Sequence, residues 1–354
     1  MKYRILKSHK LVSISICMII SLFLITGCGK QGQKLSVSDT AMGTVVQETL
    51  YVTNLEQGQL SAGEILAEIE QLEQECLSWR LEGAELAGIN ATAGKENGES
   101  VSQELRVDLE KIWQVSDKSN GALDVTIGQV TRLWDLDTWA VAGDREQAGF
   151  QEPETEVLQA ALKNTGYEKV VLKEDKIYLP EGMSLDLGAV GKGIACDRIG
   201  AYLATQEHIE GAVISVGGSI VTYGSKPDDT KWKVAILHPR EDDTYLGTLS
   251  LQGEWYISTS GDYERYVEKD GVRYHHIMNP GTGYPANSGV CSVTILSDSG
   301  LLSDALSTAC YVLGVEEGMK LAEAFGVEAL FVTQELEIFM TAGMKEYFVE
   351  DDWR

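Results

Sequence analysis

Polar side chains concentrate in two stretches of the second half of the chain. Residues 258–265 read Ser-Thr-Ser-Gly-Asp-Tyr-Glu-Arg, and residues 274–285 contain the adjacent pair His275 and His276. Neighbouring residues of a strand face opposite sides, so both imidazoles cannot point into one pocket. One of them is available as a base, because histidine accepts a proton near neutral pH. The alternative is that both histidines are structural.

A carboxylate and a hydroxyl lie four residues apart further along the chain. Asp304 and Thr308 fall within a predicted helix over 301–313, so their side chains project from one face. Both supply hard oxygen ligands suited to Mg²⁺, which is often completed by waters and substrate phosphates. Taken alone, these two residues are explained better without a metal, because an acid is common near the N-terminus of a helix.

A glycine-rich segment, 186–197, lies between a predicted strand and a predicted helix. It reads Asp-Leu-Gly-Ala-Val-Gly-Lys-Gly-Ile-Ala-Cys-Asp, so glycine amides and Lys192 could approach an anion at the start of the helix. It is neither a Walker A loop nor GxGxxG, because Lys192 is followed by glycine and the glycine spacing differs. A tight turn without a ligand explains the segment equally well. No triad motif supports a covalent hydrolase.

The composition is that of a folded protein of enzyme size. The chain has 354 residues, of which 44% are apolar, and this excludes a disordered or fibrous protein. The length allows one large domain or two modest ones. With 54 acidic and 29 basic side chains the net charge is −25, and such a chain is a poor binder of nucleic acid.

The first 28 residues resemble a lipoprotein signal. The first ten residues contain four basic side chains and no acid. An uncharged run over 11–27 follows them and ends in Ile-Thr-Gly before Cys28. This ending is similar to the lipobox of bacterial lipoproteins, whose cysteine is acylated. We therefore expect a signal peptide over 1–27, a tether over 28–38, and attachment through lipidated Cys28 to the lipid bilayer, on the extracytoplasmic face of the cell membrane. An uncleaved anchor helix is the alternative.

Strands outnumber helices along the rest of the chain and do not alternate with them. Hydrophobic periodicity predicts helices near residues 58–78, 101–119, 154–164, 191–206, 301–313 and 315–325, and a surface loop over 143–153. Strands are predicted near residues 43–53, 168–172, 176–179, 184–187, 211–216, 219–223, 231–237, 246–251, 255–259, 273–278, 290–296, 327–332 and 336–340. This order favours an α+β fold with a largely antiparallel sheet over a doubly wound one.

Four cysteines follow the signal and Cys28, and they are scattered. Cys76, Cys196, Cys291 and Cys310 form no CxxC pair, so a zinc site is not indicated. Oxidation of two of them to a disulfide stays open for an exported chain.

These segments together resemble the ApbE family, the FAD:protein FMN transferases, over nearly the whole chain after the signal. The resemblance rests on many motifs in the right order: Met42-Gly43-Thr44, Leu77-Ser78-Trp79-Arg80, Leu123-Asp124-Val125-Thr126-Ile127-Gly128, Asp186-Leu187-Gly188-Ala189 with Gly191-Lys192-Gly193, Val216-Gly217-Gly218, Thr259-Ser260-Gly261-Asp262-Tyr263, His276-Ile277 with Pro280 and Thr282-Gly283, and Asp304 with Thr308. Two stretches differ from the common family pattern. Asn279-Pro280-Gly281 stands where Asp-Pro-Arg or Asp-Pro-Lys is frequent, and Gly217-Gly218-Ser219 stands where Gly-Gly-Asp is common.

The resemblance implies one α+β domain of the T-fold type over 39–354, with FAD between its halves and Mg²⁺ on the diphosphate. Carried over by motif, the FAD contacts are Met42, Trp79, Ala122, Leu123, Asp124, Asp186, Lys192 and Ile277. The implied metal ligands are Asp304, Thr308 and the backbone carbonyl of Ala189, and the implied base is His276.

The activity implied by the resemblance is Mg²⁺-dependent transfer of FMN from FAD to a threonine or serine hydroxyl of an exported or membrane flavoprotein, with release of AMP. Two alternatives stay open: a Mg²⁺-dependent FAD pyrophosphatase that yields FMN and AMP, and a flavin-binding lipoprotein that performs no chemistry. Loss of the signal would remove four basic residues and change the net charge from −25 to −29. Either enzyme therefore needs local cations at the anionic diphosphate.

Overall fold

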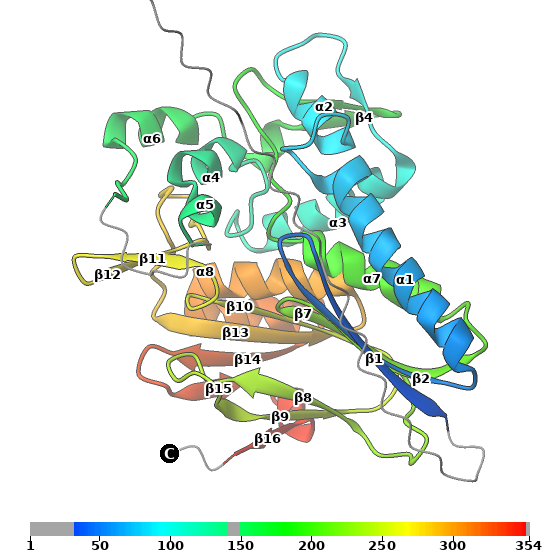
Figure 1. Cartoon of the computed structure of the whole chain (residues 1–354). Coiled ribbons are helices and arrows are strands. Elements are labelled where there is room, and N and C mark those ends of the chain that lie inside the picture. Colours follow the sequence, from blue (N-terminus) through cyan, green and yellow to red (C-terminus); the bar gives the residue numbers. More distant parts are fainter. Residues whose placement is uncertain (1–31, 141–148, 352–354) are drawn as a thin grey trace, which may run out of the picture.

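The computed structural model describes residues 32–140 and 149–351. The predicted signal peptide, Cys28 and residues 143–148 of the predicted surface loop lie outside the described residues. In Figure 1 one large sheet crosses the molecule, helices cover its upper face, and a small sheet lies below it.

The large sheet contains eight strands, and every neighbouring pair is antiparallel. In spatial order they are β1 (Gln33–Ala41), β2 (Thr44–Val52), β6 (Ile209–Val216), β7 (Ser219–Gly224), β10 (Trp255–Gly261), β13 (Val290–Ser297), β14 (Glu328–Thr333) and β15 (Ile338–Met340). The predicted α+β class with a largely antiparallel sheet is confirmed.

Three helices pack on one face of this sheet: α1 (Leu55–Gln71), α7 (Gly191–Leu203) and α8 (Gly300–Phe325). A fourth helix, α3 (Gln103–Lys118), packs on α8 and completes the core on this side. Apolar residues recur at helical spacing, for example Leu105, Leu109 and Ile112 in α3, and all three are buried. The side chain of Asn54 accepts hydrogen bonds from two backbone amides of the first turn of α1, which explains where that helix begins.

A three-stranded sheet covers the opposite face. It consists of β8 (Trp232–Leu237), β9 (Tyr245–Leu251) and β16 (Phe348–Glu350). Its buried residues Trp232 and Val234 join a second core with Ile257 and Leu330 of the large sheet. The large sheet is therefore buried on both faces.

A third group of elements forms a wall beside the large sheet. It contains α4 (Gly128–Trp134), α5 (Leu136–Ala140), α6 (Thr155–Leu162) and the hairpin of β11 (Tyr266–Lys269) and β12 (Val272–His275), which lie together in Figure 1. Trp134 and Phe150 are fully buried in its core, and Trp134 Nε1 donates to the carbonyl of Gly283 at 2.7 Å.

The remaining elements are short. They are a π-helical turn over Leu72–Leu77, α2 (Glu85–Ala91), β3 (Glu99–Ser100), β4 (Val171–Lys173), β5 (Lys176–Tyr178) and 3₁₀ turns over Tyr167–Lys169 and Gly343–Glu346. In the described part of the chain no helix is long and apolar enough to cross a bilayer. The four described cysteines are free, so no disulfide joins them.

Three predicted segments differ from the structure. The predicted tether extends too far, because residues 33–38 belong to β1 and pair with β2 along its whole length. No strand forms over 184–187, since Ser184 makes only one isolated bridge and Asp186 turns the chain by accepting from the amide of Gly188 at 2.9 Å. The strand predicted over 273–278 ends at His275.

The two helices predicted at 301–313 and 315–325 are the two halves of α8. Gly314 separates them with φ 78°, a conformation that favours glycine. A side chain at this position would also lie 2.8 Å from the carbonyl oxygen of Ser288. The break directs the first half of α8, which carries Asp304 and Thr308, along β10 and β13.

Candidate active site

A cavity of about 470 Å³ lies between the wall of α4 and α5, the ends of β10 and β12, and the first turns of α7 and α8. This is the volume of a site for a small organic ligand. Every predicted site residue within the described part of the chain lines it: Met42, Trp79, Ala122, Leu123, Asp124, Asp186, Ala189, Lys192, His276, Ile277, Asp304 and Thr308. Residues from six separate regions of the sequence thus meet at one cavity.

Asp304 and Thr308 occupy the floor of the cavity where α7 crosses α8. The amide of Gly193 donates to Asp304 Oδ2 at 2.9 Å, and Lys192 Nζ lies 3.7 Å from the same oxygen. Asp304 is 3% exposed. Thr308 Oγ1 lies 3.3 Å from the hydroxyl of Ser260 on β10. The side chains of Asp304 and Thr308 therefore have neighbours on α7 and on β10.

The N-terminus of α8 is fixed by a residue of α7. Asp197 accepts hydrogen bonds from the amide of Gly300 at 2.5 Å and from the amide of Leu301 at 3.0 Å. A carboxylate at a helix N-terminus is stabilised by the orphan amides and the helix dipole. Because Lys192 lies in the first turn of α7 and Asp304 in the second turn of α8, this contact helps to set their separation.

The oxygen donors fit magnesium. Asp304, Thr308 and Ala189 line one cavity and offer a carboxylate, a hydroxyl and a carbonyl, which are hard ligands that leave positions for water or phosphate. No group of three or more His, Cys, Asp or Glu side chains is arranged for a metal within 32–140 and 149–351.

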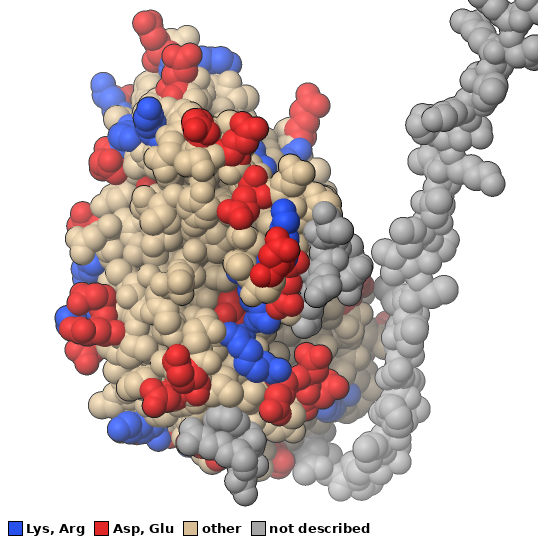
Figure 2. Space-filling model, turned by 90° about the vertical axis from the view of Figure 1, so that its left-hand side faces the viewer, with Lys and Arg blue, Asp and Glu red and all other residues tan. Residues whose placement is uncertain are grey.

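The charges of the lining also favour a cation. Seven acidic side chains and four cationic ones line the cavity, so without a bound ion its formal charge is negative. Figure 2 shows acidic and basic side chains interspersed over one face of the molecule. An anionic substrate would thus depend on cations within the cavity itself, namely Arg80, Arg132, Lys192 and Arg265.

His276 lines the cavity just beyond the end of β12. Its Nδ1 lies 3.2 Å from the carbonyl oxygen of Arg265, and its backbone amide donates to that same oxygen at 3.1 Å. Because a carbonyl only accepts, Nδ1 carries the proton and Nε2 keeps its lone pair. Burial and the nearby charges of Arg265 and Lys192 lower the pKa of His276 to about 3. The imidazole is therefore neutral near pH 7, with no proton on Nε2.

His275 points away from the cavity, as alternation along a strand requires. Its Nε2 lies 3.0 Å from the carbonyl oxygen of Ala286, and its Nδ1 accepts from the amide of Ile277 at 3.3 Å. Burial lowers the pKa of His275, so this buried ring is also neutral. The two histidines thus differ in function, and His275 has a structural place.

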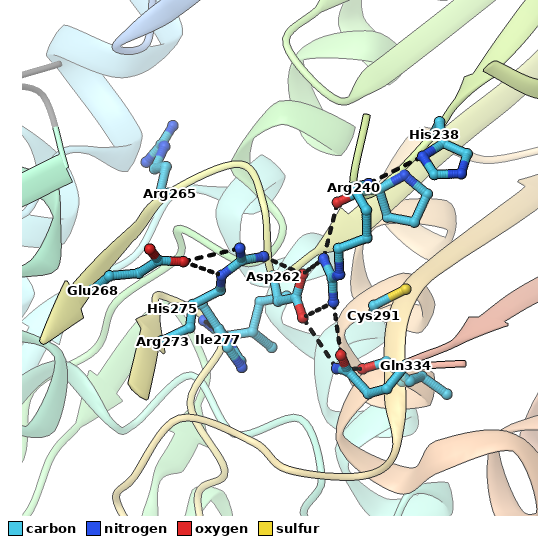
Figure 3. Close-up of polar contacts among 12 residues, drawn as sticks. His238, Arg240, Asp262, Arg265, Glu268, Arg273, His275, Ile277, Cys291 and Gln334 are labelled. Atoms are coloured by element: carbon cyan, nitrogen blue, oxygen red, sulfur yellow. Dashed lines mark hydrogen bonds and ion pairs between the residues drawn. The ribbon is translucent and has the colours of Figure 1, made fainter. Parts of the chain in front are cut away.

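The turn between β10 and β11, which carries Arg265, is anchored by a buried carboxylate. Asp262 accepts two hydrogen bonds from Arg240, at 2.6 and 2.8 Å, and further ones from Arg273 and Gln334 at 3.4 and 3.1 Å. Figure 3 shows that these side chains converge on Asp262 from separate segments, while Arg265 lies apart from them. Four segments distant in sequence are joined at this point.

Arginines gather around the indole of Trp79. The guanidinium carbons of Arg80 and Arg132 lie 4.1 and 4.3 Å from the ring centroid. Asp137 bridges Arg80 at 2.8 Å and Arg265 at 3.1 Å. Burial opposes the charge of Asp137, but the two arginines outweigh burial and lower its pKa. A flavin or adenine ring at Trp79 would share this indole with guanidinium groups.

Three predicted FAD contacts also have partners within the protein. Asp124 accepts from the amide and hydroxyl of Thr126 at 2.8 and 2.6 Å, and Asp186 accepts from the hydroxyl of Thr131 at 2.7 Å. Met42 forms the tip of the β1–β2 hairpin with φ 50° and donates its amide to Glu73 at 3.0 Å. These contacts orient the lining, and direct binding of FAD by these residues stays a prediction.

Several lining residues were not predicted. Arg132, Asp137, Glu264 and Arg265 all face the cavity. Glu264 and Arg265 end the polar stretch 258–265, so the density of polar residues was a usable signal. Arg132 and Asp137 lie between the helices predicted near 101–119 and 154–164, where no spacing indicated a site.

Comparison with known proteins matches this chain to one family. A model of the ApbE family matches residues 42–331. A FAD:protein FMN transferase of Vibrio cholerae is 32% identical over 93% of this chain and 95% of its own length. A FAD:protein FMN transferase of Treponema pallidum is 30% identical over 94% of this chain and 93% of its own length.

Solved structures give the same result. The ApbE protein of Thermotoga maritima superposes with a TM-score of 0.79 at 30% identity, covering 90% of this chain and all of the other. The apo flavinyl transferase ApbE of Pseudomonas stutzeri superposes with a TM-score of 0.75 at 28% identity, covering 90% of this chain and 98% of the other.

Proposed function

The chain belongs to the ApbE family, and on that basis we propose that it acts as a FAD:protein FMN transferase. The proposed acceptor is a threonine or serine hydroxyl of an exported or membrane flavoprotein, and the second product is AMP. The observation that carries the proposal is the meeting of Lys192, His276 and Asp304 at one cavity large enough for an organic ligand.

The proposed reaction exchanges one phosphorus–oxygen bond for another. The acceptor oxygen forms a bond to the FMN phosphorus, and the bond from that phosphorus to the bridging oxygen breaks, so AMP departs with the bridging oxygen. The hydroxyl proton passes to Nε2 of His276, which is neutral and has its lone pair available because Nδ1 donates to Arg265. Water in place of the acceptor would give FMN and AMP.

The protein's contribution to binding the diphosphate is electrostatic. Lys192 stands at the first turn of α7, where the partial positive charge of the helix adds to its own. Magnesium bound by Asp304, Thr308 and the carbonyl of Ala189 would neutralise diphosphate charge and stabilise the departing AMP. Asp304 is positioned for this by Gly193 and by the packing of α7 on α8.

We also propose that the enzyme works outside the cytoplasm. The lipobox ending at Cys28 supports acylation of this residue and anchoring to the cell membrane. The described fold begins with β1 at Gln33, so the globular part would lie close to the bilayer surface.

The experiment is covalent labelling of an acceptor. The purified protein is incubated with FAD, Mg²⁺ and candidate exported flavoproteins, and the mixture is separated on a denaturing gel. Flavin fluorescence in the acceptor band supports the proposal. Release of AMP with no labelled acceptor in any mixture would leave a pyrophosphatase, and flavin bound without AMP release would leave a carrier.

A further inference from the structure

Glu264 is a charged side chain of the cavity that the proposed chemistry does not use. It belongs to the turn between β10 and β11 and lines the cavity together with Lys192, His276 and Asp304. Within the described residues its carboxylate accepts no hydrogen bond and has no cationic nitrogen within 4.0 Å. A carboxylate without such partners at a ligand site can accept a hydrogen bond from the ligand.

The nearest cations are engaged elsewhere. Lys192 lies 3.7 Å from Asp304, and Arg265 pairs with Asp137 at 3.1 Å. Both of these cations are therefore paired with other carboxylates, and neither contacts the oxygens of Glu264.

Glu264 is held firmly despite its lack of a partner. Asp262, two residues earlier, is fixed by Arg240 and Arg273, as Figure 3 shows. On the other side, a Cβ at Gly218 would lie 2.9 Å from Glu264 Oε1, so the β6–β7 turn approaches this carboxylate closely. The carboxylate therefore lies beside the β6–β7 turn, next to the anchored Asp262 segment.

That place is nearer to solvent than the reacting groups. Glu264 is exposed, whereas Lys192 and His276 are half-buried and Asp304 is buried. A macromolecular acceptor must reach the phosphorus from the solvent side, past the base. A carboxylate there would repel the diphosphate of FAD, so its natural partner is a neutral donor.

We propose that Glu264 binds the acceptor polypeptide, by accepting a hydrogen bond from a backbone amide or hydroxyl next to the target residue. This inference rests on the proposed function, because it assigns part of the same site to the second substrate. Glu264 would then hold the acceptor in register while His276 removes the hydroxyl proton.

The test separates the two substrates. Glu264→Ala and Glu264→Gln are compared with Asp270→Asn, which removes a charge from the exposed tip of the β11–β12 hairpin. Steady-state transfer gives KM for the acceptor, and quenching of flavin fluorescence gives the affinity for FAD. Loss of a hydrogen bond to a charged group should raise the acceptor KM of Glu264→Ala about 10- to 100-fold. Glu264→Gln, which keeps a carbonyl acceptor, should lose less, and Asp270→Asn should match the wild type.

Two results overturn the inference. An unchanged acceptor KM in Glu264→Ala would show that the acceptor does not touch this residue. A fall in FAD affinity that accounts for the whole loss of transfer would assign Glu264 to the flavin substrate. Failure of the proposed function looks different, because the wild-type enzyme would then label no acceptor at all.

Discussion

The backbone amide of Gly193 donates to Oδ2 of Asp304 at 2.9 Å, so the first turn of α7 directly holds a carboxylate of α8. The helices approach so closely here that a Cβ on Gly193 would lie 2.2 Å from the carbonyl oxygen of Gly300 and 2.6 Å from Cβ of Asp304. Glycine at this position is required by the crossing of the two helices.

Gly193→Ala should therefore damage both stability and activity. The methyl group would force α7 and α8 apart, which costs roughly 1–3 kcal/mol in the free energy of unfolding and displaces Asp304. Thermal denaturation and Mg²⁺ titration of AMP release measure the two effects. Gly63→Ala is the control, because nothing lies within 4 Å of a Cβ at that helical position. Equal behaviour of the two variants would contradict the account of the crossing.

The pKa of His276 predicts how metal-free protein responds to acid. The ordinary pKa of 6.5 falls to about 3 in the folded state, so between these values the unfolded chain binds a proton that the folded chain does not. The free energy of unfolding should decrease as pH falls from 6.5 towards 3. In His276→Gln this contribution disappears and the profile becomes flatter. Denaturant titrations at several pH values test it, and parallel profiles would refute the low pKa.

The Asp262 network should make a large contribution to stability. Asp262→Ala would leave Arg240 and Arg273 partly buried without their shared partner, and breaking a buried pair costs about 3–5 kcal/mol. Because the turn after Asp262 carries Arg265, whose carbonyl orients His276, transfer should also slow. Asp242→Ala, an exposed acid in the same loop as Arg240, serves as the control. A loss below about 1 kcal/mol would show that solvent compensates the arginines.

The lipid anchor makes a prediction about fractionation. Cys28→Ala should prevent acylation and move the protein from the membrane fraction to the soluble one, with transfer activity retained. Fractionation followed by immunoblotting measures this. Retention in the membrane fraction would favour an uncleaved anchor helix over a lipoprotein.

The sequence predicted the residues of the site better than their connections. Asp304, Thr308 and His276 were named from short motifs, and each lines the cavity. The clamp on Asp262 was not predicted, because Arg240, Asp262 and Gln334 come from distant segments and no local pattern links them. Pairings of this kind depend on the fold as a whole.

Two errors in the fold have local causes. Leu185 and Leu187 alternate with polar residues as in a strand, yet both are buried from a loop whose amide at Asp186 donates to Val125. β1 was read as part of a tether because its residues are mostly polar and only Leu35 and Ala41 are buried. Its stability comes from pairing with β2, which composition does not reveal.

The central claim is that a metal-binding carboxylate of α8 enables FMN to pass from FAD to a protein hydroxyl. Asp304→Asn tests it, because the Asn side chain can still accept a hydrogen bond from Gly193 but carries no charge. The control is Asp298→Asn, which changes an exposed residue just before α8. AMP and protein-bound FMN are counted in the same reaction with FAD, acceptor and varied Mg²⁺. We expect equal amounts of both products from the wild type and the control, and neither product from Asp304→Asn or without Mg²⁺. Normal yields from Asp304→Asn, or protein-bound FMN without AMP, would contradict the claim.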